Sequence, residues 1–169
     1  LVPDQRIVIT NRVSMPSEGG GKGQSHGIYQ YVGPAKGIIT IYTKASGRTS
    51  TGEYSYPVSK NVLRHTAVHE YGHAVDKHLG EKFGGEWLSN YSGFSQALRA
   101  DRTLSQAQPW SPSLNYYRNS AHEAFAETFA HLASPYAGVV SRQKFEQSFP
   151  NVLKHMREKL PGVLKGGRF

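Results

Sequence analysis

The amino-acid sequence predicts an α+β fold built as one domain over residues 1–169. A chain of 169 residues is typical of a single hydrophobic core. The N-terminal third alternates short β-branched runs with Gly and Pro, a pattern typical of strands and turns. From about residue 59 the apolar positions repeat with the period of a helix. We therefore expect a small twisted β-sheet followed by helices.

The expected strands are three short runs: RIVIT at 6–10, GIYQYV at 27–32 and GIITIYT at 37–43. The glycine-rich segment 17–27 lacks the GxxxxGK[ST] spacing of a phosphate-binding loop, so it predicts a plain connection. The polar segment 44–57 fits either a hairpin or a loop over a site.

The strongest expected helix covers 59–79, with Ser59 as N-cap and an end near Gly80. A second strong helix follows at 121–133 and stops before Pro135. A loop rich in Pro and Ser is expected at 108–117. Weaker helical patterns lie at 86–91, 94–100, 142–149 and 151–160, the last two separated by Pro150.

Composition restricts the chemistry. The chain has no cysteine, so disulfides, thiolate metal sites and cysteine nucleophiles are excluded, and any metal must use His and carboxylates. The net charge of +8 favours association with acidic surfaces, but the basic C-terminal stretch 154–160, with Lys165 and Arg168, fits a solvated helix face better than a nucleic-acid patch. No apolar run is long enough for a membrane span.

Three histidines, His65, His69 and His73, are spaced four residues apart in the segment RHTAVHEYGHAVD. On a helix, residues four apart lie on one face, so His69 and His73 can both reach one zinc ion, while His65 lies a turn too far away. Glu70 sits beside the first ligand, where its carboxylate can act as base on a metal-bound water, as the HExxH motif requires. Gly72 predicts a close approach by another group, since glycine within a helix costs about 1 kcal/mol relative to alanine.

The helix at 121–133 is the expected source of a third ligand. Glu123 and Glu127 are four residues apart in an otherwise apolar run, and His131 continues their stripe. Burying two carboxylates is costly without a cationic partner, which a zinc ion and its histidines would provide. The alternative is a surface helix whose glutamates lie on its solvent-exposed face. If the helix does supply a third ligand, His122 is the rival of Glu123.

The two blocks HEYGHAVD (69–76) and NYYRNSAHEAFAETFAHL (115–132) resemble the catalytic domain of the anthrax lethal factor family, which includes the Pro-Pro endopeptidases. The likeness spans about 61–132 and rests on the HExxH motif followed by a tyrosine, six residues, a glutamate and a second glutamate four later. It implies a compact minimal zincin of the gluzincin type, with the sheet packed on a two-helix zinc-binding core. The first 50 and last 35 residues, roughly, carry no motif that matches.

Matched by position, the resemblance implies that His69, His73 and Glu123 bind Zn²⁺. It further implies that Glu70 is the general base, that Tyr116 stabilises the oxyanion through its hydroxyl, and that Glu127 orients a ligating histidine.

The sequence leaves the roles of three further residues undecided. Tyr117 competes with Tyr116, since sequence cannot orient adjacent tyrosines. Asp76, one turn after His73, fits either an acceptor for a ligand imidazole or a plain surface aspartate. His65 fits a core histidine or one that contacts the ligands without touching the metal.

The strand 37–43 is expected to be the sheet edge along which an extended peptide aligns, as in zincin folds. Trp110, Pro112 and Leu114 fit either a wall of the cleft or ordinary loop packing.

The predicted function is a monomeric zinc endopeptidase that cleaves protein or peptide substrates in an extended conformation. The resemblance and the first residue, Leu1 rather than Met, predict a secreted or delivered toxin or effector domain excised from a longer protein. A DNA-associated protease of the SprT kind, suggested by the basic charge, is one alternative. A non-catalytic zincin module that binds nucleic acid or anionic lipid is another, although neither partner is favoured.

Overall fold

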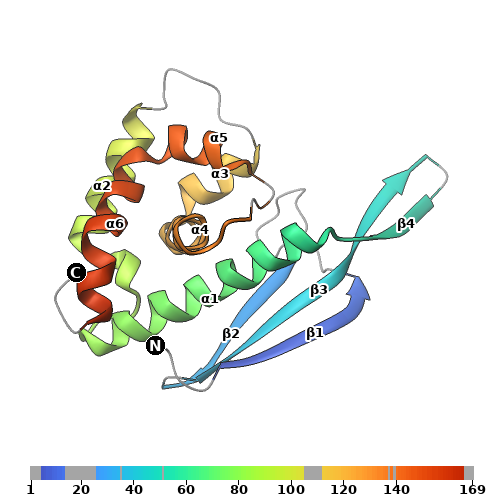
Figure 1. Ribbon diagram of the computed structural model, residues 1–169, viewed down its shortest axis with the longest axis horizontal. Helices are drawn as coiled ribbons and strands as arrows, with labels where there is room; N and C mark the ends of the chain where they lie inside the picture. The colour runs from blue at the N-terminus through green and yellow to red at the C-terminus, as the bar shows by residue number, and fades with distance from the viewer. Residues whose placement is uncertain are drawn as a thin grey trace.

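The computed structural model describes residues 5–13, 26–34, 36–50, 52–104, 112–136, 138 and 140–165. Its fold is α+β, with a mixed sheet of four strands followed by helices, which confirms the predicted fold class. Figure 1 shows the long helix α1 (Lys60–Lys82) lying across the sheet, with the other helices on the far side of α1. The helix that carries the HExxH motif is thus covered on both sides.

The sheet is built around β3 (Lys36–Thr49). This strand pairs in parallel with β1 (Gln5–Val13) and antiparallel with β2 (Gly27–Gly33) and β4 (Gly52–Pro57). The prediction that 37–43 forms the sheet edge is therefore wrong, because these residues are hydrogen-bonded on both sides. The edge next to α1 is β2.

Burial explains why β3 is central. Its side chains Ile39 and Ile41 are 0% and 4% exposed under α1, whereas Ile7 and Ile9 on the outer strand β1 are 59% and 71% exposed. The second half of β3 continues into a hairpin with β4, so the hairpin is the correct alternative for the segment 44–57.

Helix α1 begins as predicted, with the Ser59 hydroxyl accepting from the N–H of Val62 at 3.3 Å. It ends at Lys82, two residues beyond Gly80. Gly80 serves packing instead, since a Cβ atom there would lie 2.5 Å from the backbone of Trp87. The glycine therefore marks a close contact inside the helix rather than its end.

The remaining helices surround α4 (Ala121–Ala133), which has the predicted bounds. Residues 108–117 were expected to form a loop, but helix α3 (Pro112–Asn119) occupies much of this segment. Trp110 and most of the glycine-rich segment 17–27 lie outside the described residues. The two closing helices are present as predicted and divide at Pro150, which is the first residue of the second one. The other bounds are η1 (Leu88–Asn90), α2 (Ser92–Leu104), α5 (Arg142–Ser148) and α6 (Pro150–Leu164).

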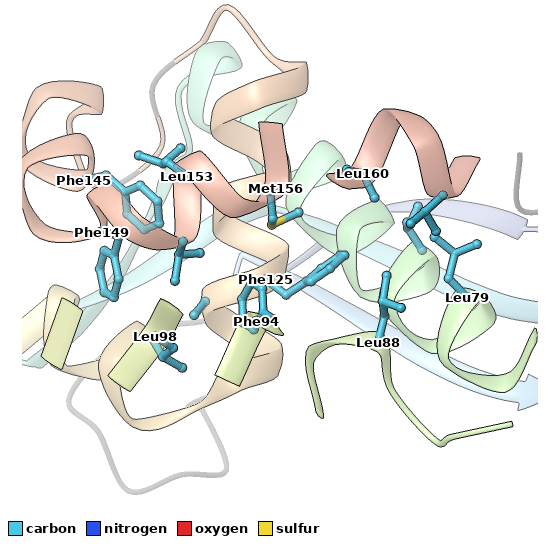
Figure 2. Packing of buried hydrophobic residues seen from close by; sticks show 14 of the residues in the cluster. Leu79, Leu88, Phe94, Leu98, Phe125, Phe145, Phe149, Leu153, Met156 and Leu160 are labelled. Atoms are coloured by element: carbon cyan, nitrogen blue, oxygen red, sulfur yellow. The ribbon is translucent and has the colours of Figure 1, made fainter. Parts of the chain in front are cut away.

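The main hydrophobic core lies among the helices. Figure 2 shows large apolar side chains from α1, η1, α2, α4, α5 and α6 meeting in one cluster. Leu114, which was a candidate for the cleft wall, is 7% exposed and belongs to this core. Within the described ranges, no helix combines the length and apolar character that crossing a membrane requires. The labelled core residues are Leu79, Leu88, Phe94, Leu98, Phe125, Phe145, Phe149, Leu153, Met156 and Leu160.

Candidate metal centre

Helices α1 and α4 approach each other at a glycine. A Cβ atom on Gly72 would lie 2.9 Å from the Cα of Ala126 and 3.2 Å from the Cβ of Phe129. Ala126 and Ala130, one turn apart on α4, are both fully buried, and their small side chains allow the two backbones to come close. The close approach expected at Gly72 is present, and it brings the polar stripes of the two helices into contact.

Three expected ligands meet at this crossing. The Nε2 atoms of His69 and His73 lie 3.2 and 3.5 Å from Oε2 of Glu123. One donor atom from each of these residues lies within 4.8 Å of the others. Tetrahedral zinc with bonds of about 2.0–2.2 Å needs donor separations of roughly 3.3–3.6 Å, and the two separations from Glu123 are close to these values.

The three side chains are largely but not fully buried. Their exposed fractions are 12% for His69, 11% for His73 and 19% for Glu123. Ser120 caps α4 by accepting from the N–H of Glu123, which fixes the glutamate in the first turn. The group therefore lies at the first turn of α4 and remains partly accessible to solvent.

The charges of this cluster are strongly coupled. Burial opposes ionisation of Glu123, but hydrogen bonds from His69 and His73 outweigh it and hold its pKa well below the usual range. Burial likewise opposes protonation of His69, yet hydrogen bonds to Glu123 and Glu127 raise its pKa well above the usual value. A metal ion would take the place of these shared protons, so its binding must release protons.

Glu70 is buried, at 5% exposed, between α1 and the edge strand β2. Its carboxylate accepts a hydrogen bond from the N–H of Tyr29. A Cβ atom on Gly27 would lie 2.7 Å from Cγ of Glu70, so only glycine lets the strand pass this close. Burial, aided by the negative charge of Glu123, raises the pKa of Glu70 against the opposing effect of His69 and His73.

The adjacent tyrosines reach different glutamates. Tyr116 is 49% exposed and hydrogen-bonds Glu123; burial and the charge of that carboxylate raise its pKa. Tyr117 is partly buried, its ring lies 6.2 Å from that of His69, and it hydrogen-bonds Glu127. Of the two, Tyr116 therefore presents its hydroxyl at the solvent-facing group of expected ligands.

Glu127 lies one turn deeper and contacts His69 from behind. Its Oε2 atom accepts from Nδ1 of His69 at 2.8 Å, which leaves Nε2 of that ring directed at Glu123. The arrangement matches the orienting role expected of Glu127, because ligating histidines commonly donate their other N–H to a carboxylate.

Asp76 and His122 lie away from the centre. Asp76 is fully buried and accepts from the N–H and hydroxyl of Ser89 at 2.6 and 2.8 Å, so it is neither an acceptor for a ligand imidazole nor a surface aspartate. His122 shares a hydrogen bond with Ser89 at 2.8 Å and packs on Trp87. The rival third ligand thus belongs to the Asp76–Ser89 cluster.

A second group of potential ligands was not anticipated. His65, Glu127 and His131 also bring their donor atoms within 4.8 Å of one another, and all three are buried. The sequence signal was the matched spacing of the two helices, 65–69–73 on α1 and 123–127–131 on α4. No pattern in the sequence predicts the contacts of Glu70 with Gly27 and Tyr29, because these residues lie far apart in the chain.

Neither the family models nor the curated proteins compared with this chain match it. The likeness to the lethal factor family therefore rests on the motif residues themselves and enters the proposal below on that basis.

Proposed function

We propose that the protein is a zinc-dependent endopeptidase of the gluzincin type. The observation that carries the proposal is the meeting of His69, His73 and Glu123, with donor atoms within 4.8 Å of one another. A glutamate as the third donor, with His122 turned to Ser89, favours this class over SprT-like proteases, which typically use a third histidine. A zinc ion bound by these residues supplies a Lewis acid that activates water and polarises a carbonyl.

The residues around the ligands have roles in peptide hydrolysis. Glu70, buried next to the two histidines, accepts the proton of the attacking water and passes it to the leaving amine. The exposed hydroxyl of Tyr116 donates a hydrogen bond to the oxygen that becomes negative in the transition state. Glu70 comes from α1 and Tyr116 from α3, so the packing of both helices against α4 determines where the two groups lie.

The edge strand β2 is the proposed docking site of an extended peptide. Its N–H at Tyr29 already bonds Glu70, so the strand passes directly beside the proposed base. A substrate added along this edge by backbone hydrogen bonds would lie next to the ligands. The resemblance further supports a secreted or delivered effector as the biological setting.

Cleavage of a diverse peptide library, read by mass spectrometry, tests the proposal. We expect the wild-type protein to cleave, and Glu70→Gln to lose about 10²–10⁴-fold in rate while it keeps its metal. Glu146→Gln is the matched control, because Glu146 lies on α5 and pairs with Arg142 and Arg157. Cleavage that persists in Glu70→Gln, or a metal-loaded wild type that cleaves nothing, would contradict the proposal.

A further inference from the structure

His65 makes two specific hydrogen bonds although it is outside the expected ligand set. It is 3% exposed, its Nδ1 lies 2.9 Å from the carbonyl oxygen of Tyr136, and its Nε2 lies 3.1 Å from Oε1 of Glu127. Tyr136 belongs to the segment that follows α4. The ring therefore joins α1, α4 and that segment at one point.

Three histidines contact Glu127, and two of them face the same oxygen, since Nε2 of His131 lies 3.2 Å from Oε1, the oxygen that His65 also faces. Oε1 faces His65 at 3.1 Å, and Oε2 accepts from Nδ1 of His69 at 2.8 Å. Because His65 and His69 hold different oxygens, the carboxylate cannot rotate without breaking one of these two bonds. The orientation of the His69 imidazole thus depends on His65 through a shared carboxylate.

Both partners of His65 are hydrogen-bond acceptors. The carbonyl oxygen and the carboxylate both accept, so both ring nitrogens lie against acceptors and the plane of the His65 ring is fixed between them.

A second metal ion between His65, Glu127 and His131 is the alternative. Three observations disfavour it: the group offers three donors within the described residues, the other oxygen of Glu127 is occupied by His69, and the site is closed. Gly138 covers the ring, since a Cβ atom there would lie 2.7 Å from Nε2 of His65. A buried structural zinc normally needs four ligands, which this group does not offer.

We infer that His65 is a positioning residue for the metal ligand His69. Through Glu127 it fixes the plane of the His69 ring and so presets the ligand geometry before a metal arrives. The inference rests on the proposed metal site, and it adds a residue that neither the HExxH motif nor the downstream glutamates identify.

Metal affinity, measured by competition with a chromophoric chelator on folded protein, tests the inference. Removing a partner that orients a ligand typically costs roughly 10–100-fold in affinity, and we expect His65→Leu to show a loss of that size. His65→Gln, which keeps one amide donor, is expected to lose less. His78→Gln is the matched control, because His78 lies on α1 outside both potential ligand groups.

A double-mutant cycle with Glu127→Gln separates positioning from a purely structural role. If His65 acts through Glu127, the effect of His65→Leu on affinity largely disappears in the Glu127→Gln background. A purely structural residue would lower the stability of the metal-free protein and leave the affinity of the folded protein unchanged. The d–d absorption of bound Co²⁺ gives an independent readout, since a misplaced ligand changes it.

The outcomes are distinguishable. Unchanged affinity in both His65 variants, while the wild type binds one metal, overturns the inference and leaves the proposed function standing. Two metals per wild-type chain, with one lost in His65→Leu, also overturns it by assigning the second group to a metal. A wild type that binds no metal overturns the proposed function, and this inference with it.

Discussion

The carboxylate of Asp76 shows how a polar residue one turn after a functional motif can serve the fold instead. Asp76 is 0% exposed, and its two oxygens accept from the N–H and the hydroxyl of Ser89 in η1. A buried acceptor of two strong donors holds the segment after α1 in place. Its contribution is therefore to stability rather than to the metal centre.

We expect Asp76→Ala to lower the free energy of unfolding by about 2–4 kcal/mol, because it leaves the buried N–H of Ser89 without its acceptor and removes one partner of the Ser89 hydroxyl. Urea denaturation measures the loss. Metal affinity of the folded variant should be unchanged, which separates this residue from Glu127. A variant of normal stability with weakened metal binding would show that Asp76 acts on the ligands.

For single residues, the sequence predicts those positions that spacing along one helix determines. His69, His73 and Glu70 follow from spacing on a single helix, which any α-helix would preserve. The partner of Asp76 lies 13 residues away, and that of Glu70 lies on a different strand. Such contacts depend on how elements pack, so spacing along the chain cannot reveal them.

The pairing of α1 with α4 is the element-scale feature on which the candidate centre depends. Gly72 contacts the backbone of Ala126, which has no freedom to move aside. Each turn of one helix then meets a turn of the other, so His69 and His73 face Glu123 while His69 and His65 face Glu127.

Gly72→Ala tests this packing. The added methyl group gains about 1 kcal/mol of helix propensity but creates an overpacked contact that costs about 1–3 kcal/mol, so we expect a net loss of stability and weaker metal binding. Gly162→Ala on α6 is the matched control, since a Cβ atom there meets nothing within 4 Å and should be neutral or stabilising. Equal behaviour of the two variants in urea denaturation would contradict the account.

The order of the strands also belongs to this scale. The runs 6–10, 27–32 and 37–43 are recognisable as strands, but their pattern does not say which neighbours pair. The run 37–43 forms the centre of the sheet, and β2 forms the edge beside Glu70. Strand order is decided by burial under α1, which lies later in the chain.

If β2 receives the substrate, peptide binding should protect its amides. We expect hydrogen exchange in inactive Glu70→Gln to slow at Gly27–Gly33 when a cleavable peptide is added, because new backbone hydrogen bonds form there. The opposite edge strand, β1, is the internal control. Protection confined to β1 would place the peptide on the wrong side of the sheet for the proposed base.

On the scale of the whole molecule, the protein is basic, yet several of its buried acidic side chains gather around the α1–α4 crossing. The net charge is +8, yet Glu70, Glu123 and Glu127 gather around the histidines of α1 and are all largely buried. Burial of several carboxylates is costly unless cations compensate. The α+β class followed from the change of period near residue 59, whereas this concentration of charge emerges only when α1 and α4 cross.

The most direct test of the central claim is metal stoichiometry after dialysis at neutral pH without chelator. We predict one zinc per wild-type chain, one in Glu70→Gln and in His122→Gln, and a large loss in Glu123→Gln and His73→Gln. That pattern would assign the metal to the α1–α4 crossing and separate its ligands from their neighbours. A wild-type protein that retains no zinc, or a Glu123→Gln variant that binds it as tightly as the wild type, would contradict the account.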